Sequence, residues 1–120
     1  MKTTTQLRHL LAADGPLLVP GAYDGASARV VASLGHEVVY LTGFGMEASI
    51  LGMPDIGLAS QAEIVGHAGN IAAAVPIPVI SDADTGYGGL TNIHRTVQSF
   101  ERAGIAAIHI EDQSLPKRCG

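Results

Sequence analysis

Three acidic side chains follow two short apolar runs, at the points where each run would end as a β-strand. Asp82 and Asp84 close the run that starts at Val79, and Glu111 follows the run 105–110. Side chains alternate along a strand, so residues two apart share a face, with their carboxylates about 6 to 7 Å apart. Oxygen ligands with room for water suit Mg²⁺, or Mn²⁺, better than Zn²⁺. The pattern predicts a divalent cation site, with helix caps and turn residues as the alternative.

A glycine-rich run follows another predicted strand. Thr42, Gly43 and Phe44 begin this run. Its hydroxyl and backbone N–H groups could bind a substrate carboxylate, and a simple β-to-α turn is the alternative. The run lacks the third glycine of a dinucleotide-binding fingerprint and any clear helix start. It is therefore weak evidence for a nucleotide.

The only cysteine lies among cations. Cys119 follows Lys117 and Arg118 directly. Two positive charges beside a thiol lower its pKa and raise the thiolate fraction. Cys119 is therefore a candidate general acid or base, although a single cysteine is more often inert.

An alternation of helical and strand patterns must position these groups. Helical spacing and caps predict helices, and short apolar runs predict strands. Strands separated by helices pair in parallel through right-handed crossovers, which fits either a doubly wound sheet or a (β/α)₈ barrel. Polar clusters at the end of every predicted strand favour the barrel, whose active site is assembled there. The predicted helices are 3–13, 24–34, 60–72 and 92–103, and the predicted strands are 17–20, 38–42, 79–82 and 105–110.

Composition excludes several classes of protein. Charged residues make up 15% of the 120 residues and the net charge is −4. No basic patch is present, which argues against nucleic-acid binding. No apolar run reaches membrane-spanning length. The single Cys119 rules out an intramolecular disulfide framework, which fits a reduced, cytoplasmic setting.

Three motifs keep the order and spacing of one known family. Shorter matches at 19–24, 40–43 and 51–55 extend the likeness to nearly the whole chain. The three motifs are Asp-Ala-Asp-Thr-Gly-Tyr-Gly at 82–88, Ile-Glu-Asp-Gln at 110–113 and Pro-Lys-Arg-Cys-Gly at 116–120. With these motifs the sequence resembles the isocitrate lyase / phosphoenolpyruvate mutase superfamily, and the Lys-Arg-Cys-Gly element is typical of its lyase branch.

The resemblance implies a fold, an assembly and a metal. The fold is a (β/α)₈ TIM barrel, of which residues 1–120 form the N-terminal half with the first four strands. The usual assembly is a homotetramer with a swapped C-terminal helix. The resemblance implies Mg²⁺ held directly by Asp84, which thereby also serves the substrate, with Asp82, Asp55 and Glu111 contributing through water.

The same resemblance implies a substrate pocket and a closing loop. Tyr40, Thr42, Gly43 and Phe44 would surround the carboxylate of an α-keto or α-hydroxy acid. The family commonly has a second glycine where this chain has Phe44, so Phe44 would reshape the pocket. Residues 117–120 would form a mobile loop over the site. On this loop Lys117, Arg118 and Cys119 would be catalytic residues, with Cys119 as the acid/base.

The implied reaction is cleavage of a carbon–carbon bond. A 2-hydroxy di- or tricarboxylate of the methylisocitrate or dimethylmalate type would yield an α-keto acid and a carboxylic acid through a metal-bound enolate. A phosphonomutase and an oxaloacetate hydrolase are alternatives on the same fold. A complete barrel needs about 250 residues. We therefore expect 120 residues to be inactive alone, and a non-catalytic fragment or half-barrel interaction module is a further alternative.

Overall fold

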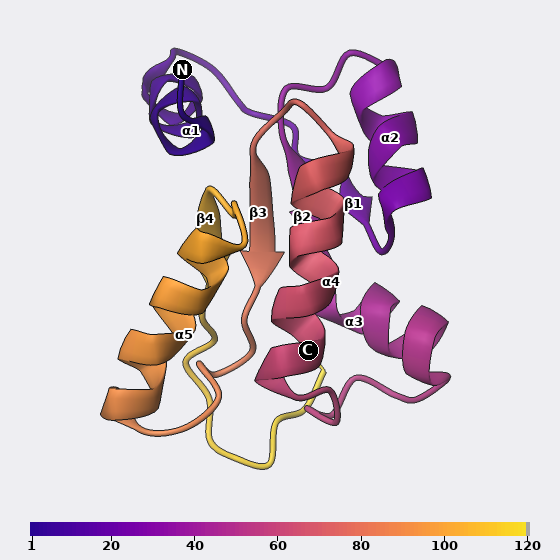
Figure 1. Cartoon of the computed structure of the whole chain (residues 1–120), viewed down its shortest axis with the longest axis vertical. Coiled ribbons are helices and arrows are strands. Elements are labelled where there is room, and N and C mark those ends of the chain that lie inside the picture. The colour runs from indigo at the N-terminus through magenta and orange to yellow at the C-terminus, as the bar shows by residue number, and fades with distance from the viewer. Residues whose placement is uncertain (120) are drawn as a thin grey trace.

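A single parallel sheet organises the chain. The computed structural model describes residues 1–119, and Figure 1 shows its elements. The strands pair in sequence order and all in parallel, with Tyr40 opposite Ile80 and Asp82 opposite His109. The predicted parallel α/β order is confirmed. The four strands are β1 (Gly21–Ala22), β2 (Val39–Leu41), β3 (Val79–Asp82) and β4 (Ala107–His109).

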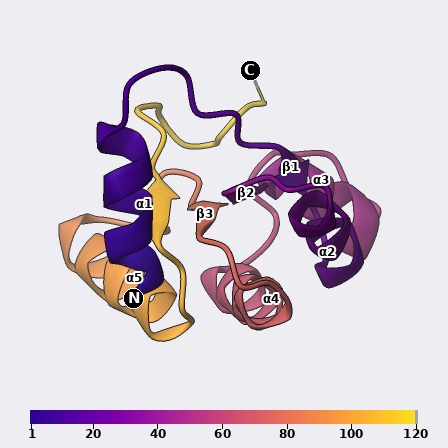
Figure 2. The same cartoon turned by 90° about the horizontal axis from the view of Figure 1, so that it is seen from above.

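Helices cover one face of this sheet. Seen from above in Figure 2, α2, α4 and α5 lie side by side along that face. The apolar core fills the space between them and the strands, and burying this surface stabilises the layer at roughly 25 cal/mol per Å². The helical segments are α1 (Thr3–Ala12), α2 (Gly25–Ser33), α3 (Gly43–Met46), the π-helix η1 (Glu47–Leu51), α4 (Gln61–Ala74) and α5 (Leu90–Arg102).

Side-chain caps fix where two of the covering helices begin. The Asp24 carboxylate accepts the Ser27 backbone N–H at 2.7 Å and starts α2. Ser60 and Glu63 form a reciprocal capping box at the start of α4, as their spacing predicts. No helix within residues 1–119 is long and apolar enough to cross a membrane.

The structure corrects two predictions, the position of the first strand and the conformation of the segment after Thr42. The first strand occupies Gly21–Ala22 instead of 17–20, because Pro20 has no N–H and joins the ladder only by accepting the Tyr40 N–H at 2.9 Å. The predicted loop after Thr42 is helical in α3 and η1. The Thr42 hydroxyl accepts the Gly45 N–H at 3.2 Å, so this side chain caps a helix. The glycines of the run had favoured the prediction of a loop.

Candidate active site

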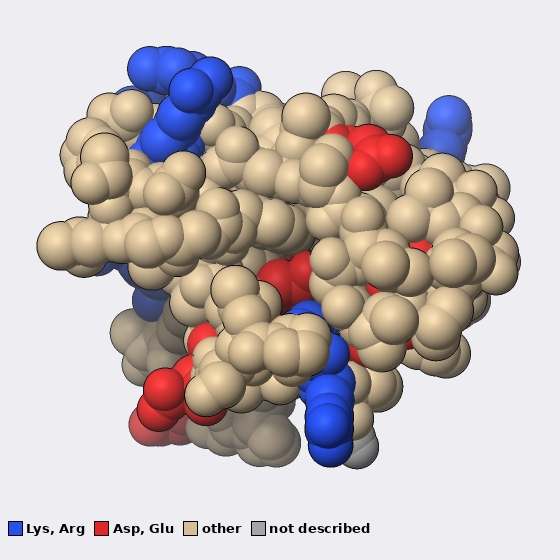
Figure 3. Space-filling model, turned by 90° about the horizontal axis from the view of Figure 1, so that it is seen from below, with Lys and Arg blue, Asp and Glu red and all other residues tan. Residues whose placement is uncertain are grey.

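The carboxyl ends of β3 and β4 bring three acids together. Asp82 ends β3, Asp84 lies in the turn that follows, and Glu111 comes two residues after β4. One carboxylate oxygen of each lies within 4.8 Å of the others. Figure 3 views the molecule from this end and shows acidic atoms in a central hollow, with basic atoms beside them. The three acids singled out by their spacing do converge.

A tight turn produces this convergence, where the sequence had suggested strand alternation. The Asp84 N–H donates to Asp82 Oδ1 at 2.9 Å, and the Asp84 backbone has a positive φ of 45°. The Glu111 N–H donates to the Asp84 carbonyl at 2.7 Å, which ties the turn to the chain after β4. Asp84 therefore leaves the strand and folds back over its end. The two aspartates do not share a face of one extended strand.

The ammonium of Lys117 lies among the acids. Lys117 is only 2% exposed. Its Nζ lies 2.8 Å from Asp55 Oδ1, contacts Asp84 Oδ1 and lies 3.6 Å from Glu111 Oε1. The structure thus brings Lys117, a predicted catalytic residue, to the predicted metal ligands. Asp55, a predicted metal ligand, pairs with Lys117 and lies outside the group of three acids.

Burial and charge set the protonation of this cluster. Desolvation raises the pKa of Asp84; the Lys117 ammonium works in the opposite direction, and Asp82 and Asp55 add to the rise. Desolvation alone would lower the pKa of Lys117, but its hydrogen bonds to Asp55 and Asp84 outweigh this and the pKa is raised. Lys117 is therefore a firmly held cation.

The donor set fits an additional hard cation. Three carboxylates, those of Asp55, Asp84 and Glu111, lie within 3.6 Å of the Lys117 ammonium. Asp82 adjoins two of these acids, so negative charge remains in excess. Lys117 engages Oδ1 of Asp84. Clustered carboxylates repel one another unless a cation offsets their charge. Oxygen-only ligands on a half-open surface suit Mg²⁺ or Mn²⁺.

The end of β2 supplies the predicted substrate side of the site. The Tyr40 hydroxyl lies 3.2 Å from His109 Nδ1, and burial together with the charges of Asp82 and Glu111 raises the pKa of Tyr40 to about 12. Its phenol is therefore protonated at neutral pH. His109 was not predicted as a site residue, although its position two residues before Glu111 was the available signal.

The residues after β2 lie close to the acids. A Cβ at Gly43 would lie 2.7 Å from Asp82 Oδ2, so a larger residue there would displace the Asp82 carboxylate. Thr42 uses its hydroxyl to cap α3. Phe44 is 58% exposed and is free to contact a ligand. The predicted substrate-binding run therefore adjoins Asp82.

The cysteine segment differs from its prediction in one respect. Partial desolvation and the nearby Asp55 carboxylate raise the pKa of Cys119, where the adjacent cations had suggested a lowered pKa. The reason is that Lys117 turns inward to the acids, while the exposed Cys119 faces Asp55. Arg118 is exposed, and its backbone N–H donates to Gln113 Oε1 at 3.0 Å. Gly120 of the predicted loop lies outside the described residues.

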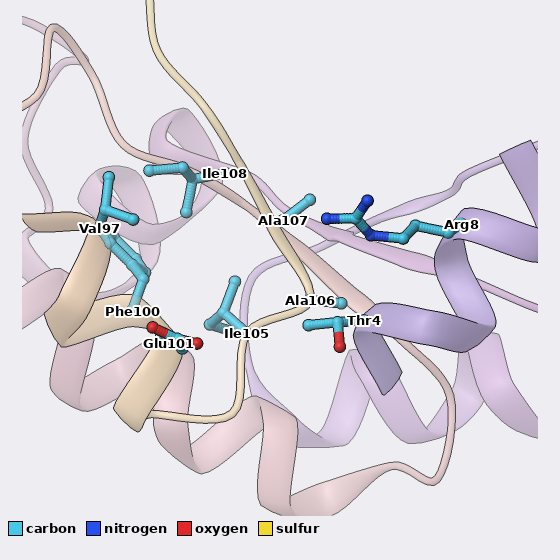
Figure 4. A pocket seen from close by; sticks show the side chains of 9 residues that line it. All are labelled: Thr4, Arg8, Val97, Phe100, Glu101, Ile105, Ala106, Ala107 and Ile108. Atoms are coloured by element: carbon cyan, nitrogen blue, oxygen red, sulfur yellow. The ribbon is translucent and has the colours of Figure 1, made fainter. Parts of the chain in front are cut away.

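The pockets differ in their relation to the acids. A pocket of about 310 Å³ adjoins them and includes Asp84, Tyr87 and Lys117 in its wall. Another, of about 280 Å³, lies between α1, α5 and β4 and is shown in Figure 4. Its wall includes Arg8 and Phe100 but none of the predicted site residues. We therefore assign the site to the strand ends.

Known proteins resemble this chain in sequence. The profile of the phosphoenolpyruvate phosphomutase family matches residues 7–119. A 2,3-dimethylmalate lyase of Eubacterium barkeri is 47% identical over 120 residues, which are 100% of this chain and 42% of that protein. A 2-methylisocitrate lyase of Aeropyrum pernix is 45% identical over 114 residues, 95% of this chain and 37% of its own length.

Solved structures agree with these relatives. Oxaloacetate acetylhydrolase in complex with the product oxalate superposes with a TM-score of 0.94 at 45% identity, over 98% of this chain and 42% of that one. The structure of a 2,3-dimethylmalate lyase superposes with a TM-score of 0.92 at 44% identity, over 99% of this chain and 40% of that one. A complex of phosphonopyruvate hydrolase with oxalate and Mg²⁺ superposes with a TM-score of 0.92 at 31% identity, over 98% of this chain and 41% of that one.

Fold and likeness together define the class of this protein. Four parallel strands with acids at their carboxyl ends form part of a TIM barrel of the phosphoenolpyruvate mutase/isocitrate lyase type. The chain belongs to the phosphoenolpyruvate phosphomutase family, in the phosphoenolpyruvate mutase/isocitrate lyase superfamily. It spans about two fifths of the length of the relatives that it matches.

Proposed function

We propose that the full-length protein carrying this chain is a Mg²⁺-dependent carbon–carbon lyase. Its substrate is a 2-hydroxy di- or tricarboxylate of the methylisocitrate or dimethylmalate type, and its products are an α-keto acid and a carboxylic acid. The observation that carries the proposal is the group of Asp82, Asp84 and Glu111 at the strand ends, with Lys117 inserted among them. The lyases at 45–47% identity support this choice of reaction.

Each side chain has a role in this proposal. Asp84, with Asp82 and Glu111, would hold Mg²⁺, which when bound supplies positive charge beside the oxygens of the substrate. Thr42, Gly43 and Phe44 bind a substrate carboxylate at the end of β2. Tyr40 donates a hydrogen bond from its phenol to a substrate oxygen, because its raised pKa keeps the hydroxyl protonated.

The thiol is proposed as the proton donor. When the carbon–carbon bond breaks, the substrate hydroxyl loses its proton to solvent, its carbon becomes the keto carbon, and the electron pair of the broken bond moves to the departing carbon. Cys119 delivers its proton to that carbon, and its thiolate then regains a proton from solvent. A raised pKa keeps Cys119 protonated at neutral pH, which suits the acid role. Lys117 and Arg118 flank the thiol on the segment that carries it.

Oxaloacetate hydrolysis is a second candidate function. The observation that favours it is the superposition with oxaloacetate acetylhydrolase at a TM-score of 0.94 and 45% identity. A phosphonomutase remains an alternative on the same fold, and a non-catalytic half-barrel module is the alternative without chemistry. We further propose residues 1–120 as the N-terminal half of one barrel domain, in a cytoplasmic homotetramer.

A substrate panel tests the proposal. The full-length protein is incubated with Mg²⁺ and a series of 2-hydroxy di- and tricarboxylates, and release of the α-keto acid is followed with lactate dehydrogenase and NADH. Oxaloacetate is assayed in parallel for oxalate. Mg²⁺-dependent release of pyruvate or glyoxylate supports the lyase. Oxalate release alone would replace it with the hydrolase, and no product from any substrate would contradict both.

A further inference from the structure

A buried carboxylate outside the acid group has no assigned role. Glu47, at the start of η1, is only 1% exposed. Its Oε1 accepts the Ala59 N–H at 3.0 Å, and its Oε2 shares the Ile56 N–H, at 3.3 Å, with the Pro54 carbonyl at 3.0 Å. Within residues 1–119 no Lys, Arg or His forms a salt bridge with it. Burial of a carboxylate is costly, so two backbone donors with no cation mark an unusual arrangement.

These hydrogen bonds hold the segment that carries Asp55. The Met53 N–H donates to the Glu47 carbonyl at 3.2 Å, so Glu47 fixes the segment before and after Asp55. Apolar packing contributes little, because most side chains of the segment are exposed, and only Asp55 and Ala59 are buried. The position of Asp55 therefore depends on the Glu47 carboxylate. The exposed residues are Met53, Pro54, Ile56, Gly57 and Leu58.

Asp55 in turn holds the segment that carries the thiol. Its Oδ1 lies 2.8 Å from Lys117 Nζ, and a Cβ built on Gly57 would lie 3.6 Å from Lys117 Cβ. The segment 53–59 thus forms one wall of the space that Lys117 fills. Lys117 is the only buried residue in 112–119, so it is the anchor of that stretch.

We propose that Glu47 is a positioning residue, which acts through Asp55 on Lys117 and so holds the segment 113–119 over the acids. For catalysis this inference rests on the proposed function, because Cys119 must reach the substrate. The alternative is a purely structural role, in which Glu47 accepts two backbone N–H groups and stabilises the fold. The two differ in whether its effect requires Lys117.

Proteolysis of the anchored segment is the first readout. Full-length Glu47→Ala protein is treated briefly with trypsin under conditions where it remains folded, and cleavage after Arg118 is followed by mass spectrometry. We expect cleavage about tenfold faster than in wild type, since loss of two hydrogen bonds to a charged acceptor frees the wall that retains Lys117. Glu47→Gln keeps one acceptor and is expected to fall between the two.

Two comparisons separate positioning from general stabilisation. Glu63→Ala is the matched control, because the Glu63 carboxylate also accepts a backbone N–H, that of Ser60, but forms no hydrogen bond with residues 53–59. The second comparison repeats Glu47→Ala in a Lys117→Ala background, where Arg118 is still available to trypsin. We expect Glu63→Ala to leave the rate of cleavage nearly unchanged. In the Lys117→Ala background we expect Glu47→Ala to cause no further increase in that rate.

Either result bears on Glu47 whether or not the lyase is correct. Equal acceleration with and without Lys117, or from Glu63→Ala as well, would overturn the inference and leave Glu47 a stabilising cap. If the substrate assay also succeeds, Glu47→Ala should lower kcat with KM nearly unchanged. Should Glu47→Ala fail to fold, Glu47→Gln carries the same comparison.

Discussion

Replacing Lys117 by methionine tests the electrostatics of the site most sharply. The ammonium contacts Asp84 and Asp55 and lies 3.6 Å from Glu111. Methionine keeps much of the length of the side chain but removes its charge. In Lys117→Met without metal, the carboxylates have no buried cation beside them. Removing one partner of a buried ion pair lowers the free energy of unfolding by about 3 to 5 kcal/mol. We expect the lower end here, because the Glu111 side chain is 26% exposed.

The same substitution should strengthen divalent metal binding. At a separation of about 5 Å, a divalent cation and a unit positive charge repel by about 1.7 kcal/mol in a water-like dielectric and by about 7 kcal/mol at an effective dielectric constant of 20. The smaller value applies here, because the Glu111 side chain is 26% exposed and leaves one side of the acid group open to screening by water. Loss of the ammonium should therefore lower the Kd for Mg²⁺ roughly tenfold to thirtyfold.

Isothermal titration calorimetry of the metal-free full-length protein measures this shift directly. Thermal unfolding with and without Mg²⁺ gives a second reading, since metal should restore more stability to Lys117→Met than to wild type. Arg118→Met is the control, because Arg118 is an adjacent but exposed cation and should leave the Kd unchanged. An unchanged or higher Kd in Lys117→Met would refute the reasoning, since the ammonium would then help to organise the metal site.

Three further substitutions test the substrate side. Cys119→Ser should lower kcat about a hundredfold or more with little change in KM, because the thiol acts on the reacting carbon; an unchanged kcat would return Cys119 to an inert role. Tyr40→Phe should remove an ultraviolet transition near pH 12, since burial, Asp82 and Glu111 raise the pKa of Tyr40 to about 12 and oppose the phenolate. A Tyr40 transition near its ordinary pKa of about 10 would contradict this environment. Phe44→Ala should alter the ranking of substrates in the panel more than it alters metal affinity, and an unchanged ranking would remove Phe44 from the pocket.

The order of the strands could be predicted from sequence because the signals are local. Apolar runs and the caps at Asp24 and Ser60 lie within a few residues of the elements that they define. The first strand was misplaced because an apolar run does not show which of its residues pair with β2; Pro20 has no N–H to donate, so the paired residues are Gly21 and Ala22. The helix after Thr42 was missed because a side-chain cap, and not residue propensity, determines it.

The acid group could be predicted in membership but not in geometry. Asp82, Asp84 and Glu111 follow neighbouring strands, and parallel strands end at one edge. The inward turn of Lys117 could not be predicted, because it depends on a contact with Asp55, 62 positions earlier in the chain. That contact also explains why the expected lowering of the Cys119 pKa was wrong. The role of Glu47 required knowledge of which backbone N–H groups face it.

The central claim is that the three acids at the strand ends form one divalent cation site. Electron paramagnetic resonance of Mn²⁺ titrated into the metal-free full-length protein counts such sites, and Asp84→Asn is the matched variant. We predict one tightly bound Mn²⁺ per chain in wild type, displaced by Mg²⁺, and its loss in Asp84→Asn. Tight binding that persists in Asp84→Asn, or its absence from a folded wild-type protein, would contradict the account.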